Sequence, residues 1–247
     1  MDRLAYAAIS GMHAAMARQA ATAHNLSNTN TPGFRGDMSA ASTIWETGGG
    51  LPTHAFASAE VTGADMKDGA VSQTGKPLDI ALQKDALLTV QAPNGDEAYT
   101  RRGDLQVSDS GLLTTGDGTP VLGENGPITI PPNSSVTVSD TGTVSIVPVG
   151  GKPTDVTEVD KLKLVSATGS KIVKGEDNLF RVMGGGALPS DPDARVQSSA
   201  IEGSNVNASE ALIQMIDASR SWETQVKMLA TAKEMDTSAT QLMQLSD

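Results

Sequence analysis

The chain has 247 residues, 18 basic and 29 acidic side chains, a formal net charge of −11 and no cysteine. The length allows one large or two small domains. Disulfides, thiolate metal sites and cysteine nucleophiles are excluded. The acidic balance without a basic stripe argues against a nucleic-acid partner, which needs clustered Lys and Arg. No apolar run approaches the roughly 18 residues of a direct membrane span, and the N-terminus lacks the basic and apolar regions of a cleaved signal peptide.

Residues 1–34 are predicted to form an N-terminal helix and an Asn-rich turn. From Asp2 to about Asn28 there is no Pro and a single Gly, and charged residues are few. Apolar residues recur at helical spacing: Ile9, Met12, Met16, Ala20, Ala23 and Leu26. Ala8, Gly11 and Ala15 form an adjoining stripe so small that another backbone could approach closely. Pro32 and Gly33 end the helix, because Pro restricts the residue before it and Gly can turn.

The middle of the chain follows a different periodicity. Residues 35–69 are predicted to be an irregular connector with scattered Gly, Pro, Ser and Thr, and residues 191–204 a linker. Over 70–190, apolar residues alternate, as in Val136 and Val138 and then Val144 and Ile146, between clusters of turn residues such as Pro93-Asn94-Gly95-Asp96. Short strands with such punctuation predict an antiparallel, all-β domain.

Residues 205–247 are predicted to form a C-terminal helix, since Gly and Pro are absent from them. Steps of three and four give a heptad seam: Leu212, Met215, Ser219, Trp222, Val226, Leu229, Lys233, Asp236, Thr240 and Met243. About 40 residues make a rod of roughly 60 Å, whereas a compact domain of this size has a radius of gyration of about 18 Å. The β domain cannot cover such a helix, so we expect it to pair, with the N-terminal helix as the nearest candidate. The predicted fold class is α+β, with two long terminal helices paired as a coiled coil around a central antiparallel β domain.

Asparagines cluster at the inner ends of both helices. Asn25, Asn28 and Asn30 can cap or turn the end of the first helix, and Asn205 and Asn207 can cap the start of the second. Two interpretations stay open, caps alone or caps that also make subunit contacts at a hinge. The Met-containing stripe of the first helix is equally open to ordinary core packing. We favour intermolecular packing, because the helix is remote from the β domain and almost uniformly apolar.

Three patterns could indicate other classes of function. Asp109-Ser110-Gly111 and Asp140-Thr141-Gly142 imitate the paired loops of an aspartic-type hydrolase, and Arg102-Gly103-Asp104 imitates an adhesion tripeptide, but each lies where a turn or a β-domain motif is expected. The chain has three histidines, His13, His24 and His54, with no carboxylate at ligand spacing. We predict no catalytic residue, no cofactor and no metal; a hydrolase or an adhesin is the less favoured alternative.

Four sequence motifs resemble the flagellar axial family of rod and hook proteins, in order and over nearly the whole chain. They are Asn25-Leu26-Ser27-Asn28-Thr29-Asn30-Thr31-Pro32-Gly33-Phe34-Arg35, Thr74-Gly75-Lys76-Pro77-Leu78-Asp79-Ile80-Ala81, Tyr99-Thr100-Arg101-Arg102-Gly103, and Glu202-Gly203-Ser204-Asn205-Val206-Asn207 continuing to Trp222-Glu223. Ala86-Leu87-Leu88 departs from the Gly-Phe-Phe of many relatives, and Trp222 from a common Tyr. The length and the opening Met1-Asp2-Arg3-Leu4 are most similar to a proximal rod subunit, with a distal rod subunit as the alternative.

This resemblance implies a structural subunit of the bacterial basal-body rod, located in the periplasm and exported by the flagellar type III apparatus without a cleaved signal peptide. Its partners would be other proximal and distal rod proteins and copies of itself, with the helices lining an inner tube and the β domain facing outward. The expected subunit-interface residues are Leu4, Ile9, Met12, Met16, Leu26, Leu212, Met215, Trp222, Val226 and Leu229. The expected motif and hinge residues are Asn25, Asn28, Thr31, Pro32, Gly33, Phe34, Gly203, Ser204, Asn205, Val206 and Asn207. We also expect the ends to be poorly ordered in the monomer and to fold on assembly.

Overall fold

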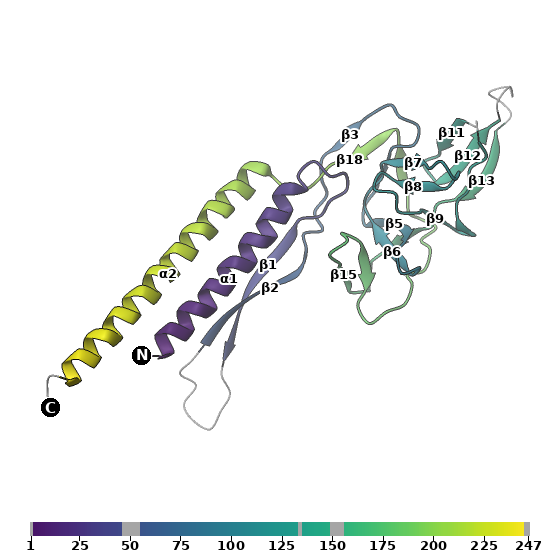
Figure 1. The fold of residues 1–247 in the computed structure, drawn as a ribbon. Helices are drawn as coiled ribbons and strands as arrows, with labels where there is room; N and C mark the ends of the chain where they lie inside the picture. Colours follow the sequence, from purple (N-terminus) through teal and green to yellow (C-terminus); the bar gives the residue numbers. More distant parts are fainter. Residues whose placement is uncertain (1, 46–54, 133–134, 149–155, 245–247) are drawn as a thin grey trace. The chain divides into compact units, whose positions relative to one another are not determined.

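Two long helices lie at the ends of the chain in the computed structural model, which describes residues 2–45, 55–132, 135–148 and 156–244. Helix α1 covers Asp2–Ser27 and helix α2 covers Ala208–Gln244 (Figure 1). Gly11 is the one helix-weakening residue in α1, and α2 has neither Gly nor Pro. With a largely antiparallel β region between the helices, the predicted α+β class is confirmed.

Asparagine side chains lie at both inner helix ends. The Asn28 backbone N–H and its Nδ2 both donate to the carbonyl oxygen of His24, at 3.2 and 2.9 Å. The Asn207 Oδ1 accepts the N–H groups of Ser209 and Glu210, at 2.9 and 3.4 Å. Asn207 therefore has the capping role predicted for it. Asn205 does not, because its contacts are with the β region described below.

The chain divides into two compact units. The helical unit comprises the described residues of Met1–Asn28, Gly36–Asp65 and Val206–Asp247, and the β unit comprises those of Thr29–Arg35 and Met66–Asn205. These boundaries differ from the predicted ones in one respect that matters for function. The turn Thr29–Arg35 packs with the β unit, whereas the sequence grouped it with the N-terminal helix.

The prediction of an irregular connector over 35–69 is wrong. Strands β1 (Asp37–Trp45) and β2 (Ala55–Ala64) form an antiparallel hairpin with a register shift between Met38 and Ser39. The Asp65 N–H donates to the Gly36 carbonyl oxygen at 2.8 Å, and this hydrogen bond joins the two strands at the open end of the hairpin. The hairpin packs along α1 within the helical unit (Figure 1), and that packing supplies the partner that an isolated hairpin lacks in water.

The prediction of a linker over 191–204 is also wrong, because two strands lie there, β17 (Val196–Ser198) and β18 (Ala200–Glu202). They pair with β4 and β3 respectively. The other strands of the β unit are β3 (Val71–Gln73), β4 (Ile80–Leu82), β5 (Ala86–Gln91), β6 (Glu97–Thr100), β7 (Leu105–Val107), β8 (Leu113–Thr115), β9 (Leu122–Gly123), β10 (Gly126–Pro127), β11 (Ser135–Val138), β12 (Thr143–Val147), β13 (Thr157–Lys161), β14 (Leu164–Ser166), β15 (Ile172–Lys174) and β16 (Phe180–Val182).

The largest sheet of the β unit is antiparallel, with the strand order β14-β5-β6-β16-β15. A second sheet has the order β11-β12-β13, and its inward residues are the alternating ones that the sequence indicated, Val136, Val138, Val144 and Ile146. Between the strands lies a core of mainly aliphatic side chains, including fully buried Leu88. The buried Tyr99 hydroxyl accepts the N–H of Leu188 at 2.6 Å.

Candidate functional site

Helices α1 and α2 lie side by side in the helical unit (Figure 1), and small residues form the face between them. Ala8 and Ala15 of α1 are buried, and a Cβ at Gly11 would lie 2.8 Å from the Gln225 side chain of α2. The Ala8-Gly11-Ala15 stripe therefore permits the close approach that the sequence indicated.

The predicted heptad seam of α2 is displaced by one residue at some of its positions, whereas the predicted seam residues Met215 and Leu229 are half-buried. Buried positions on α2 are Ala211, Ala218 and Ala232, at multiples of the heptad spacing. The predicted seam positions Leu212 and Val226 are exposed instead. Small side chains allow the closer helix approach, so they take the inner face and leave the larger apolar ones outside.

The predicted interface residues thus lie mostly on the outer surface of the helical unit. Ile9, Met16, Leu212, Trp222 and Val226 are exposed, with Met16 at 55% and Leu212 at 49% of their full accessible surface. The half-buried ones are Met12, Leu26, Met215 and Leu229. Leu4 lies in α1, but its side chain falls outside the described part of the chain.

More exposed apolar side chains on α2 extend this surface, and the sequence reasoning did not select them. They are Ile213, Ile216, Met228 and Met235. Single exposed apolar residues are normal on a protein surface, but these two helices carry many of them. We call the exposed apolar residues of α1 and α2 together the apolar helix surface. A simple count of large apolar residues on both sides of the seam could have found it.

The turn after α1 is anchored in the β unit through its glycine. The Gly33 N–H donates to the carbonyl oxygen of Glu202 at 2.8 Å. Gly33 has φ +64°, and a Cβ there would lie 2.3 Å from the backbone carbonyl atoms of Arg101. Only glycine fits both the left-handed conformation and this close approach.

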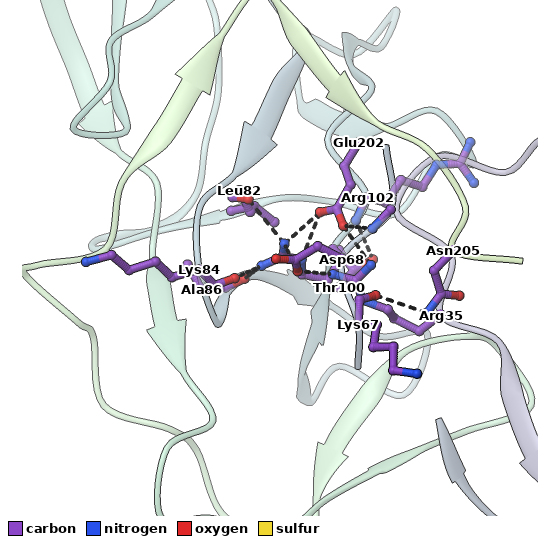
Figure 2. Close-up of polar contacts among 12 residues, drawn as sticks. Arg35, Lys67, Asp68, Leu82, Lys84, Ala86, Thr100, Arg102, Glu202 and Asn205 are labelled. Carbon is purple, nitrogen blue, oxygen red and sulfur yellow. Dashed lines mark hydrogen bonds and ion pairs between the residues drawn. The ribbon is translucent and has the colours of Figure 1, made fainter. Parts of the chain in front are cut away.

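The next residue of the motif, Phe34, is buried under a lysine. Its ring centroid lies 3.8 Å from the Lys174 Nζ, and that same ammonium group donates to the Arg35 carbonyl oxygen at 2.8 Å. The Asn205 N–H donates to the Phe34 carbonyl oxygen at 3.2 Å, and its Nδ2 donates to the Lys67 carbonyl oxygen at 3.0 Å (Figure 2). The residues that follow α1 and precede α2 are therefore held against each other on the β unit.

Beside this turn lies a group of charges, Arg35, Asp68, Arg101 and Glu202, which we call the Glu202 cluster. Figure 2 labels Arg35, Asp68 and Glu202 of this group. The Glu202 Oε1 lies 2.6 Å from the Arg35 Nη1, and its Oε2 accepts from the Arg101 Nη2 at 2.7 Å. Asp68 Oδ1 lies 2.9 Å from Arg35 and 3.1 Å from Arg101. Arg35, Arg101 and Glu202 are at most 2% exposed, and Asp68 is 64% exposed.

Arg101 also supports the backbone around it. Its guanidinium donates to the carbonyl oxygens of Leu82, Lys84 and Ala86, where the chain turns from β4 into β5. Burial lowers the pKa of Arg101, and the nearby positive charge of Arg35 adds to that effect, while the Glu202 carboxylate opposes it. The cluster thus joins charges from four chain segments, of which Arg35, Arg101 and Glu202 are buried and Asp68 is exposed.

The remaining motif residues have ordinary structural contacts. Asn25 receives the Asp37 N–H on its Oδ1 at 2.7 Å and donates to the Asp37 carbonyl oxygen at 2.9 Å, while the His24 Nδ1 lies 2.5 Å from Asp37 Oδ2. The Gly203 N–H donates to the Ala70 carbonyl oxygen at 2.9 Å. The half-buried members of the set are Thr31, Pro32, Ser204 and Val206.

The patterns that could indicate other functions are structural. Asp109-Ser110-Gly111 and Asp140-Thr141-Gly142 form the turns of the β7–β8 and β11–β12 hairpins. In the RGD tripeptide, the Arg102 Nε donates to Asp104 Oδ1 at 2.6 Å. Among the described residues there is no group of three His, Cys, Asp or Glu side chains that could hold a metal ion. Neither described helix is long and apolar enough to cross a membrane.

Comparison with known proteins matches three regions of the chain to flagellar families. Residues 6–35 match the family described as Flagella basal body rod protein, residues 81–146 the Flagellar hook protein FlgE/F/G D1 domain, and residues 197–242 the Flagellar basal body rod FlgEFG protein C-terminal. The flagellar basal-body rod protein FlgF of Salmonella typhimurium is 40% identical over 252 aligned positions that cover 100% of both chains. The chain belongs to the FlgF family of flagellar basal-body rod proteins.

Two further relatives place the chain within that group. The FlgF of Escherichia coli is also 40% identical over 100% of both chains. The rod protein FlgG of Bacillus subtilis is 28% identical over 95% of this chain and 97% of its own. The FlgF family is thus favoured over the distal-rod alternative, and the chain is a structural rod protein. The first and last matches contain the turn Thr31–Arg35 and Glu202, so the anchored turn lies within family sequence.

Proposed function

We propose that this FlgF-family chain is a structural subunit of the proximal basal-body rod, part of the drive shaft that transmits torque from the motor to the hook. It polymerises with copies of itself and with neighbouring rod proteins through α1 and α2. The carrying observation is the apolar helix surface: large side chains such as Leu212 and Trp222 face outward, while alanines occupy the face between the helices.

The geometry supports a coiled-coil-like pair with further neighbours. Ala and Gly bring α1 and α2 close without using their larger apolar side chains. Those side chains gain burial only against another chain, at about 25 cal/mol per Å² of apolar area. The pair then lines the inner tube of the rod, and the β unit faces outward.

Assembly and folding of the ends are coupled in this proposal. The dilute monomer has poorly ordered helices, because its apolar helix surface is not covered. The flagellar type III apparatus exports this monomer to the periplasm. Full helical circular dichroism and protected α1 and α2 amides in dilute monomer would contradict the coupling, though not the rod assignment.

The rod assignment is tested by substitutions on the apolar helix surface. The variant Leu212→Gln/Val226→Gln is expected to keep a folded β unit but to be absent from purified basal bodies, with loss of swimming. Its matched control is Met183→Gln, since Met183 is an exposed apolar residue of the β unit at 66% accessibility. Normal incorporation of the double variant would overturn the proposal.

A deletion gives a second test, and the structure determines which residues can be deleted. Removing residues 2–28 takes away α1 and spares Thr29–Arg35, which the β unit needs. We expect the deleted chain to retain β-unit protection against urea and to lose incorporation. An aspartic-type hydrolase or an adhesin would keep its activity after this deletion.

A further inference from the structure

We propose that the Glu202 cluster anchors the chain at two points on the β unit, whether or not α1 and α2 are helical. The first anchor point is the turn Thr31–Arg35, which follows α1, and the second is Asn205, which precedes α2. The cluster gives the isolated subunit a fixed place at which both ends of the chain leave the β unit.

The carboxylate of Glu202 is the hub of these contacts. Its Oε1 lies 2.6 Å from the Arg35 Nη1 and accepts the Gly69 N–H at 2.9 Å. Its Oε2 accepts from the Arg101 Nη2 and Nε at 2.7 and 3.0 Å. The backbone carbonyl oxygen of the same residue accepts the Gly33 N–H at 2.8 Å. A single buried residue thus connects the turn, the segment that precedes β3 and the residue that follows β6.

The charges of the cluster balance only with Glu202 present. Arg35 and Arg101 contribute two positive charges, and Glu202 and Asp68 two negative ones. Asp68 is 64% exposed, so Glu202 is the one buried counter-charge in the cluster. Removal of one partner from a buried ion pair leaves an uncompensated charge, which strongly destabilises the structure around it.

The anchor does not depend on the helices, because each of its contacts joins two residues of the β unit. This holds for the Glu202 contacts, for the Asn205 N–H bond to Phe34 and for the Lys174 bond to Arg35. Unfolding of α1 and α2 removes none of them. The anchor therefore persists in a subunit whose ends are not yet paired.

The test is amide hydrogen exchange by NMR on the full chain at low concentration. The variant Glu202→Gln is expected to speed exchange at Gly33, Gly69 and Asn205 at least tenfold, and to leave β5 and β12 unchanged. The control Asp104→Asn removes a carboxylate from the ion pair with Arg102 in the same unit, and should leave Gly33, Gly69 and Asn205 unchanged.

Two results would overturn the proposal. One is unchanged exchange at Gly33, Gly69 and Asn205 in Glu202→Gln; the other is equal acceleration in β5 and β12, which would make Glu202 a general core residue. If Glu202→Gln does not fold, Asp68→Asn replaces it. Asp68→Asn must then speed exchange at Gly33 beyond the Asp104→Asn control, and no difference counts against the anchor. Basal-body incorporation is measured separately, so failure of the anchor is distinct from failure of the rod assignment.

Discussion

The ammonium group of Lys174 lies 3.8 Å from the centre of the Phe34 ring and donates to the carbonyl oxygen of Arg35 at 2.8 Å. Lys174 ends β15, one of the two edge strands of the largest sheet. One side chain thus fastens the motif turn to that edge by a cation–π contact and a hydrogen bond. The family motif is in this way part of the β unit's tertiary structure, beyond its role at a helix end.

Lys174→Met is expected to destabilise the β unit by about 1–2 kcal/mol, because it removes both the cation–π contact and the hydrogen bond. Urea unfolding of the β unit, followed by the far-UV circular dichroism of its strands, measures this change. The exposed Lys171, on the same hairpin, provides the control, and Lys171→Met should change stability by less than about 0.5 kcal/mol. Equal losses of stability in the two variants would show that the contacts of Lys174 with Phe34 and Arg35 do not stabilise the β unit.

Gly33→Ala is expected to destabilise the β unit by about 3 kcal/mol or more, since it adds a steric clash to left-handed strain. The new Cβ would lie 2.3 Å from the backbone of Arg101, which cannot yield as a flexible side chain can. Gly118→Ala is the matched control, with φ +87° and open space around its Cβ. It should lose only about 1–2 kcal/mol from backbone strain. Similar losses would mean that the close approach at Gly33 is unimportant.

Gly11→Leu is expected to reduce incorporation into basal bodies, because it forces apart the small-residue face between α1 and α2. A Cβ at Gly11 already approaches the end of the Gln225 side chain at 2.8 Å. Gln225→Ala creates room, so the double variant should recover part of the incorporation that the single variant loses. Gly11→Ala should assemble nearly normally, as the flexible Gln225 end can move and Ala favours the helix by about 1 kcal/mol. If the double variant recovers no incorporation, Gly11 does not lie against Gln225 of α2 in the rod.

Asp177→Asn is expected to destabilise the β15–β16 hairpin at neutral pH and to have no effect in strong acid. The hydrogen bond from Arg181, at 2.9 Å from Nη1, lowers the pKa of Asp177 below its ordinary 3.8. A lowered carboxyl pKa stabilises the fold above the unfolded-state value, and that contribution is lost as pH falls through the folded-state value. Because both side chains are about one third exposed, the neutral-pH loss should be under about 1 kcal/mol and should shrink in high salt. A difference that persists in strong acid would contradict this origin.

Periodicity predicted the regular elements well where local sequence decides them. Helical spacing with few Gly and Pro residues gave α1 and α2 to within a few residues, and alternation at Val136 and Val138 gave β11. The β1–β2 hairpin was missed because its strands are rich in small residues, as in Ser39-Ala40-Ala41-Ser42, and have weak strand propensity. Packing along α1 decides that hairpin, and no local pattern reports it.

The candidate site was predictable in part. The motif residues and part of the exposed apolar helix residues were found, but the seam was assigned to Leu212 and Val226 on the rule that large apolar residues pack inward. Close packing of helices prefers Ala211 and Ala218 instead. The Glu202 cluster was missed because Arg and Glu are usually exposed, and because its members meet only once the strands between them have folded.

The order of the elements along the chain has a consequence for biosynthesis. A nascent polypeptide leaves the ribosome with α1 complete, yet its partner α2 appears only after the whole of the β unit has been translated. Throughout that interval Ala8, Gly11 and Ala15 have no helix against them. These three residues present only methyl groups and hydrogen atoms, so this stripe of the α1 segment offers little apolar surface to other proteins before α2 is synthesised.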